Sequence, residues 1–296
     1  MRSRNTNTAI SNVLLPTDFS DESAQAVDCA RSLCDWYGSK LYVAHVMDLF
    51  PFSLRTDPEA SIKIKRIRQQ ADAEMKAFVL EHHLTGTISA TALLAGEPSV
   101  AIEKFTTKRE IDLIAIGSKG EQGLNRLFQG SVAEEIFRTA HCPVIVVGPK
   151  ARIRMDVGGF TKLLFASDLS PISRAAVPMI EFLLNRNPSA TALLVHFLDE
   201  ESENVIVRHD TRVRIERQLV EIISPELRSR VEAAVEMSPA PDDGMIDMVE
   251  GRAADLLVLG VRSGGAFTRA ATHGLCAKTP RVISEALCPV LTIRGE

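Results

Sequence analysis

The chain is poor in cysteine and aromatic residues, nearly balanced in charge, and free of long apolar runs. Its five cysteines, an odd number without CxxC spacing, argue against a disulfide framework or a zinc site and indicate reduced thiols. The longest apolar runs, such as VIVV and LLVL, fall far short of the roughly 18 residues of a membrane helix. A net charge of −4 provides no global basic field for nucleic acid or acidic membranes. The start, MRSRNTNTAI, lacks the apolar stretch of a secretory signal. We therefore expect a soluble, cytoplasmic protein with no nucleic-acid or membrane partner.

The sequence does contain an internal repeat. Four blocks of the first half return in the same order in the second half, at offsets between 143 and 151 residues. LLPTDFS returns as LLFASDLS, LYVAHVMD as ALLVHFLD, DLIAIG as DLLVLG, and HCPVIVV as LCPVLTI. The length of 296 residues also suits about two domains of ordinary size. We therefore predict a tandem duplication with domains at residues 1–150 and 158–296, joined within the segment KARIRMDVGG.

Strand and helix patterns alternate along the first half. Apolar runs predict strands at residues 12–16, 40–46, 87–95, 112–116 and 144–147. Helical spacing predicts helices at residues 20–37, 60–83, 99–108 and after Ser131. Of Cys29 and Cys34, five positions apart in the first helix, one is expected to face the core. Alternating strands and helices imply right-handed βαβ units and a parallel sheet that is covered on both faces.

A glycine-containing segment, IGSKGEQGLNRLFQGSV at residues 116–132, carries the strongest functional signal. It follows a predicted strand and precedes a helical pattern, and nine residues separate Gly120 from Gly130 and Ser131. Glycine lets the backbone approach a ligand closely, and the first N–H groups of a helix favour an anion. Ser131 would cap that helix and present its hydroxyl to phosphate. The spacing predicts a nucleotide phosphate site; the alternative is a long connection with incidental glycines.

With these motifs, the first half resembles the ATP-binding subgroup of the universal stress protein family. The matching stretches are LLPTDFS, the HVMD that ends the second strand, AGEPSVAI, the pattern G-2x-G-9x-G-S, and CPVIVV. The second half matches in degraded form, so the resemblance covers essentially the whole chain. It implies two tandem flavodoxin-like (adenine nucleotide alpha hydrolase-like) three-layer α/β sandwiches, each with a five-stranded parallel sheet of order 3-2-1-4-5. The ligand site would lie at the carboxyl ends of the first and fourth strands, where the strand order reverses.

The resemblance also implies which residues bind ATP, with Mg²⁺ accompanying the nucleotide. Asp18 would accept a hydrogen bond from an amino group or a ribose hydroxyl, and Val46 would pack on the base. The other positions implied for the base and ribose are Pro16, Thr17, Ile116 and Gly117, and those for the phosphates are Gly120, Gly130, Ser131 and Val132. Lys119 and Arg126 lie in the same loop and can add positive charge beside the polyphosphate. For Asp18, the alternative is a cap of the first helix shared with Ser20.

The second half departs from the phosphate motif. The loop after Gly260 is one residue longer, and Gly274 falls at the right spacing only if the count starts at Gly264. Leu275 and Cys276 then stand where the first half has its serine and valine. The Gly-x-Pro turn before the third helix is also missing, where the sequence reads PAPDDGMI. We therefore expect one ATP site, in the first half.

Other patterns indicate no catalytic site. There is no GxxxxGK[ST] motif and no GxGxxG after the first strand, so neither a P-loop nor a dinucleotide site is indicated. His45 and His196 occupy equivalent positions and are predicted to be structural. The basic runs KIKRIR and 208–217 are interpreted as solvated helix faces without aromatic residues for stacking. The positively charged or titratable residues of the loop after Gly260 are interpreted as solvated: Arg262, Arg269 and His273. The alternative is that they bind some other anion.

The expected function is that of a tandem universal stress protein that binds ATP in its N-terminal domain. It would act in stress response or signalling through nucleotide-dependent interactions, with no catalytic residue assigned. The two domains would pair through their last strands, 144–147 and 290–293, because exposed edge strands need cover. Whether the chain also forms a homodimer stays open. The alternatives are slow ATP hydrolysis or autophosphorylation at Ser131, and a structural interaction module that holds no nucleotide.

Overall fold

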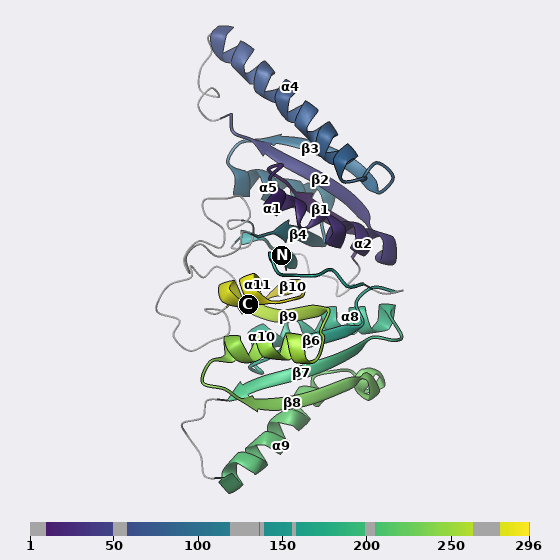
Figure 1. Cartoon of the computed structure of the whole chain (residues 1–296), viewed down its shortest axis with the longest axis vertical. Coiled ribbons are helices and arrows are strands. Elements are labelled where there is room, and N and C mark those ends of the chain that lie inside the picture. The colour runs from purple at the N-terminus through teal and green to yellow at the C-terminus, as the bar shows by residue number, and fades with distance from the viewer. Residues whose placement is uncertain are drawn as a thin grey trace.

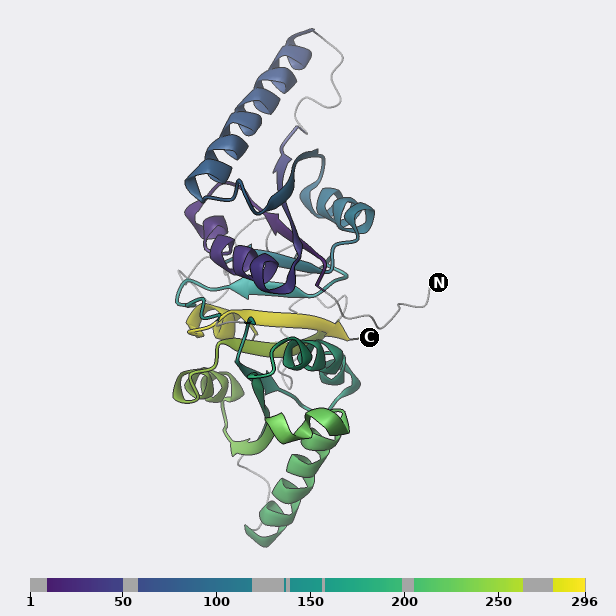
Figure 2. The same ribbon diagram turned by 90° about the vertical axis from the view of Figure 1, so that its right-hand side faces the viewer.

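The structure is a computed structural model. It describes residues 10–49, 58–118, 136, 139–155, 158–198, 205–262 and 279–295. The two halves are stacked along the longest axis of an elongated molecule (Figure 1). Helices α4 (Pro58–Glu81) and α9 (Val205–Glu221) lie at its opposite ends, and the strands of the two halves meet in the middle (Figures 1 and 2).

Each half repeats the same succession of strands and helices. Besides α4, the first half contains β1 (Asn12–Pro16), α1 (Asp21–Ala24), α2 (Val27–Tyr37), β2 (Lys40–Met47), β3 (Ile88–Ala95), α5 (Pro98–Arg109), β4 (Leu113–Gly117) and β5 (Val144–Val147). Besides α9, the second half contains β6 (Lys162–Ala166), α7 (Pro171–Arg174), α8 (Val177–Arg186), β7 (Thr191–Leu198), the 3₁₀ helix η2 (Pro225–Arg230), β8 (Val231–Met237), α10 (Pro241–Gly251), β9 (Leu256–Arg262), α11 (Thr279–Glu285) and β10 (Val290–Gly295).

The strands within the described residues form one continuous sheet of order β3-β2-β1-β4-β5-β10-β9-β6-β7-β8. Neighbouring strands within each half run parallel, and each half has the order 3-2-1-4-5. This confirms the predicted fold class: two tandem flavodoxin-like α/β units. The repeat in the sequence is therefore a repeat of structure.

The two halves are joined through β5 and β10, the strands that the sequence analysis expected to pair. They run antiparallel, with Val290 opposite Val146 and Thr292 opposite Val144. The buried hydroxyl of Thr292 also donates to the backbone oxygen of Val144 at 3.0 Å. The pairing covers the edge that each half would otherwise expose at this point.

Side chains alternate between the two faces of the sheet, and helices cover both faces. One face carries α2, α4, α8 and α9, whose buried side chains include Leu33, Phe78 and Leu219. The opposite face carries α5, α10 and α11, with Phe105 and Met245 among the buried residues. Each half is therefore a three-layer sandwich.

The first predicted helix is divided into α1 and α2. Ser20 caps α1, because its hydroxyl accepts a hydrogen bond from the Ser23 N–H at 3.2 Å. Gly38 ends α2 in the left-handed conformation, with φ of 69°, as the sequence predicted. The interruption between the two helices, at residues 25 and 26, was not predicted.

Both cysteines of α2 are buried, so the expectation that only one faces the core is wrong. Both side chains belong to a core cluster that includes residues of both halves, and Tyr37 of the same helix packs on Phe182 of the second half with ring centroids 5.7 Å apart. Burial raises the pKa of the Cys34 thiol to about 12. Both thiols are therefore structural rather than reactive.

Candidate functional site

The carboxyl ends of β1, β2 and β4 lie side by side at one edge of the first half. β1 is the middle strand, with Pro16 opposite Ala44 of β2 and Leu14 opposite Ile114 of β4. The chain crosses from one side of β1 to the other between β3 and β4, so the strand order reverses here. In open α/β sheets, ligands bind outside the carboxyl ends of the strands at such a point.

Three residues predicted to lie around the base and the ribose come from three different strands and share one face of the sheet. By alternation, Pro16, Val46 and Ile116 fall on the face that carries α5. Pro16 and Ile116 are buried, so they support this edge from beneath. Val46 is only partly buried and therefore offers apolar surface to a ligand.

Thr17 uses its side chain to shape the loop after β1. Its hydroxyl accepts a hydrogen bond from the Phe19 N–H at 2.9 Å and shares one with Ser23 Oγ at 2.8 Å. Its own N–H donates to the Ala44 carbonyl oxygen at 2.8 Å. With only 6% of its surface exposed, Thr17 positions the loop from within.

Asp18, in contrast, is exposed at the mouth of this edge. Its carboxylate oxygen Oδ1 accepts from the Ser20 N–H at 3.1 Å and from Ser20 Oγ at 2.5 Å. Burial raises the pKa of the carboxyl, but hydrogen bonds from Ser20 and Ser23 outweigh it and hold the pKa below its ordinary 3.8. Asp18 thus holds Ser20, the residue that caps α1, and its predicted role toward a ligand would be additional to this contact.

His45 has the structural role that the sequence predicted. Its Nδ1 lies 2.9 Å from the backbone oxygen of Thr17, and its ring stacks on Phe19 at 4.4 Å between centroids. Phe19 itself has a positive φ of 63°. In the second half, His196 Nδ1 makes the same contact with the Ser167 oxygen at 2.8 Å. The loop after the first strand is therefore built alike in both halves.

Gly117, predicted to lie beside the ribose, is also required for packing inside the protein. A Cβ atom at this position would lie 1.7 Å from the backbone oxygen of Glu22, so α1 contacts the end of β4 directly. Gly260 is equivalent, because its Cβ would lie 2.5 Å from Cα of Ser173 in α7. A glycine at this position in both halves is therefore the feature of the sequence that indicates the close contact between strand and helix.

Ser118 is a residue that the sequence analysis did not single out. It follows Gly117 and is 1% exposed, and its N–H donates to the Val147 oxygen at 3.0 Å. Within the described part of the chain, its buried hydroxyl has no hydrogen-bond partner. An unpaired buried hydroxyl at this edge of the sheet can form a hydrogen bond with an added polar group. Because Ser118 directly follows the glycine that ends β4, its position in the sequence could have identified it as a candidate site residue.

The remaining predicted site residues lie outside the described residues. For the first half these are Gly120, Gly130, Ser131 and Val132, together with Lys119 and Arg126. For the second half they are Gly264, Gly274, Leu275 and Cys276, together with Arg269 and His273. The structure therefore describes the base and ribose side of the predicted site.

Two general properties can be stated for the residues described above. They include no group of three or more His, Cys, Asp or Glu side chains placed to hold a metal ion. In the same ranges, no helix has the length and apolar character to cross a membrane.

The sequence of each half matches the universal stress protein family, over residues 9–148 and 159–294. A universal stress protein of Methanocaldococcus jannaschii is 31% identical over 145 residues, which cover 49% of this chain and 85% of that protein. A universal stress protein of Thermus aquaticus is 31% identical over 136 residues, which cover 46% of this chain and 96% of that protein. Each of these relatives thus corresponds in length to one half of the chain.

The duplicated architecture also occurs in a solved structure. A universal stress protein from Archaeoglobus fulgidus has a TM-score of 0.64 and 22% sequence identity, and the match covers 98% of each chain. The similarity therefore extends over both halves and the junction between them.

Proposed function

Since the chain belongs to the universal stress protein family in both halves, we propose that it binds ATP in its first half and acts through nucleotide-dependent interactions in a stress response. The observation that carries the proposal is the meeting of Asp18, Val46 and Ile116 at the edge where the strand order reverses. The glycine pattern that follows β4 supplies the phosphate side.

The described residues fit the base and ribose of an adenine nucleotide. Val46 supplies apolar surface for a planar base, and Asp18 supplies a carboxylate whose lowered pKa keeps it ionised near neutral pH. A carboxylate accepts hydrogen bonds from ribose hydroxyls or an exocyclic amino group. Ser118, whose buried hydroxyl has no hydrogen-bond partner among the described residues, directly follows Gly117 in the sequence. The site therefore combines one apolar surface with a few polar groups, as small-molecule sites generally do.

The phosphates would be held by Gly120, Gly130, Ser131 and Val132, whose order along the chain is that of a glycine loop leading into a helix. Backbone N–H groups at a helix start are suited to phosphate oxygens, and the Ser131 hydroxyl adds a donor. Mg²⁺ would accompany the polyphosphate and reduce its charge. The protein residues bind and orient the nucleotide in this proposal, and binding rather than turnover is the function.

Pairs of mirrored variants test the proposal. Asp18→Ala and Gly130→Val alter the first half, whereas Asp168→Ala and Gly274→Val make the matching changes in the second. Asp168 is a close control for Asp18, because it also accepts from the N–H of the serine two residues on, at 3.0 Å. Mg-ATP should raise the melting temperature of the wild type and of both second-half variants.

The first-half variants should respond differently. Loss of a hydrogen bond to a charged group costs about 1.5–3 kcal/mol, which is roughly tenfold or more in affinity for Asp18→Ala. Gly130→Val should abolish the shift, because a branched side chain blocks the backbone approach. Equal effects of first-half and second-half variants would contradict the placement of the site.

Slow ATP hydrolysis is the second candidate function, and autophosphorylation at Ser131 is its variant. Either requires a base or a nucleophile near the γ-phosphate. Release of phosphate that disappears in Asp18→Ala and Gly130→Val would support this alternative. Absence of any thermal shift at millimolar Mg-ATP would instead support an interaction module without a nucleotide.

A further inference from the structure

The second half carries its own version of the edge where the first half is proposed to bind the base. β6 lies between β7 and β9, and Ala166 and Leu259 occupy the positions of Pro16 and Ile116. These side chains pack in the core on the same face of the sheet as their counterparts. The carboxyl edge therefore has the same strand arrangement in both halves of the chain, so the two edges can be compared residue by residue.

The residue equivalent to Val46 is Phe197, which precedes the last residue of β7. Like Val46, it packs on the core of the face that carries α5 in the first half and α10 in the second. A Cβ atom on Gly244 would lie 2.6 Å from the Cε1 atom of Phe197. The phenyl ring thus lies directly against the backbone of α10, where the first half has Ala101 in place of Gly244. A larger ring and a smaller helix residue together fill the space beside the strand end.

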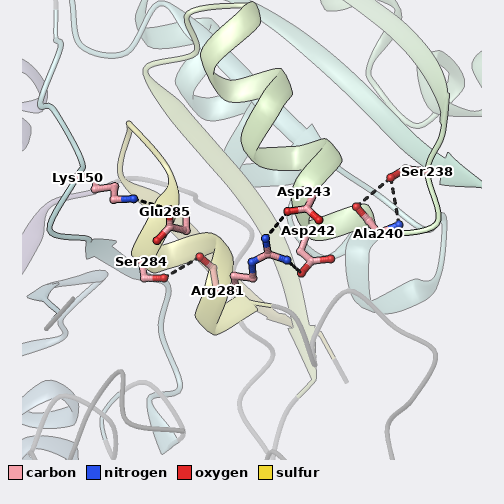
Figure 3. A network of polar contacts seen from close by, with 8 residues as sticks. All are labelled: Lys150, Ser238, Ala240, Asp242, Asp243, Arg281, Ser284 and Glu285. Atoms are coloured by element: carbon pink, nitrogen blue, oxygen red, sulfur yellow. Dashed lines mark hydrogen bonds and ion pairs between the residues drawn. The ribbon is translucent and has the colours of Figure 1, made fainter. Parts of the chain in front are cut away.

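The start of α10 differs from that of α5 as well, because Asp242 and Asp243 stand where the first half has Ser99 and Val100. Asp242 and Asp243 lie in the first turn of α10, and Arg281 extends from α11 to both of them (Figure 3). Arg281 Nη1 lies 2.9 Å from Asp242 Oδ2, and Nη2 contacts Asp243 Oδ1. Asp242 is 8% exposed, so the bridge is partly enclosed. The two carboxylates interact favourably with the positive end of the α10 dipole. Two carboxylates and one guanidinium give the cluster one net negative charge.

From these two features we infer that the second half is a self-occupied copy of the nucleotide site. The Phe197 ring takes the place of the base, and the Arg281–Asp242–Asp243 cluster closes the mouth against an anionic polyphosphate. This inference rests on the proposed function of the first half. Phe197 in the second half and Val46 in the first are thus the residues that determine which edge accepts an adenine base.

Helix α11, which carries Arg281, is also tied to the first half, through contacts at its other end. Lys150, which follows β5, pairs with Glu285 at the end of α11 at 2.5 Å (Figure 3). The Arg152 N–H donates to the Leu287 carbonyl oxygen at 2.9 Å. The second half is thereby held as a preformed structural partner that needs no ligand to complete it.

Reciprocal exchange of the two residues tests the inference. Full-length wild type, Val46→Phe and Phe197→Val are irradiated with 2-azidoadenosine, a base probe without phosphates, and labelled peptides from each half are quantified separately. Wild type should be labelled in the first half only. Val46→Phe should lower first-half labelling by at least about tenfold, and Phe197→Val should produce labelling of second-half peptides at residues near β6, β7 and α10.

Labelling of each half, measured separately, distinguishes failure of this inference from failure of the proposed function. Equal labelling of both halves in the wild type would overturn the inference while leaving the first site intact. Undiminished first-half labelling in Val46→Phe would also overturn the inference. The same holds if a folded Phe197→Val protein shows no labelling of second-half peptides. Absence of label from both halves of the wild type would instead count against the proposed function. Circular dichroism and, for Phe197→Val, retained first-half labelling establish that each variant is folded.

Discussion

At the scale of single residues, the glycine that ends β4 has a role that the phosphate motif alone does not explain. Gly117 lets Glu22 of α1 approach the strand, and Gly260 does the same for α7. Because the second half has a shifted motif without its serine and still has this glycine, packing is sufficient reason for the presence of Gly260. The other motif residues are then the ones that distinguish a binding half from a structural half.

Gly117→Ala should therefore destabilise the protein even without nucleotide. The new methyl group would overlap a backbone oxygen that cannot move without displacing α1, and forced overpacking costs about 2 kcal/mol. Urea unfolding of the ligand-free protein measures the loss. Gly86→Ala is the matched control, since its Cβ would meet no atom within 4 Å. Equal stability of the two variants would show that α1 does not depend on this contact.

Asp18 should contribute to the dependence of stability on pH. Its pKa is lowered in the folded protein by hydrogen bonds from Ser20 and Ser23, which outweigh the effect of burial. A carboxyl with a depressed folded pKa stabilises the fold above its unfolded pKa, near the ordinary 3.8, and that stability is lost as the pH falls through the folded pKa. Asp18→Ala should thus be less stable than the wild type near neutral pH and approach it in acid.

Thermal midpoints measured from neutral pH down to about pH 2 test this prediction. Asp18→Asn is a useful comparison, because an amide oxygen can accept the same hydrogen bonds but carries no charge. It should retain part of the neutral-pH stability without the acid dependence. A constant difference between wild type and Asp18→Ala at every pH would contradict a charge contribution from this carboxylate.

At the scale of elements, β5 and β10 are the point where two folded units become one sheet. Thr292 contributes a backbone pairing with Val144 and a buried side-chain hydrogen bond to the same residue. Thr292→Val keeps the shape but removes the donor. Loss of this hydrogen bond should lower the free energy of unfolding by about 1 kcal/mol, as measured by urea titration.

The control for this prediction is Thr191→Val, an exposed threonine at the start of β7. Valine is favoured in strands, so this change should be close to neutral. If both variants unfold alike, the hydroxyl of Thr292 does not stabilise the junction.

The sequence predicted most elements because their signals are local. Apolar runs marked the strands, and Pro98 and Gly38 fall where a helix begins and ends. The separation of α1 from α2 could not be predicted in this way, since Gln25 and Ala26 favour helix. It is set by tertiary packing, because α1 lies on the end of β4 while α2 lies on the body of the sheet.

The same distinction applies to the site. Strand ends and a glycine pattern are visible in the sequence, and the resemblance to the family then implied that Pro16, Asp18 and Val46 lie at one edge. The buried hydroxyl of Ser118 and the ring of Phe197 against Gly244 depend on what surrounds them in space. The sequence shows that Phe197 of β7 stands where β2 has Val46. It does not show which space the phenylalanine ring occupies.

At the scale of the whole molecule, duplication has produced two units with one architecture and different edges. The sheet is continuous across them, and the loop after the first strand is built alike in both. The differences are concentrated at the carboxyl edge, in Phe197, in the cluster around Arg281, and in the loss of the serine that follows the last glycine. We therefore predict a functionally asymmetric molecule within a nearly symmetric fold.

Calorimetric titration of the full-length protein with Mg-ATP tests this asymmetry most directly, because it counts binding sites. The account predicts one nucleotide per chain, with heat of binding that is lost in Gly130→Val and retained in Gly274→Val. Two nucleotides per chain would contradict the asymmetry and show that the second edge is open. No binding at millimolar Mg-ATP would contradict the nucleotide function itself.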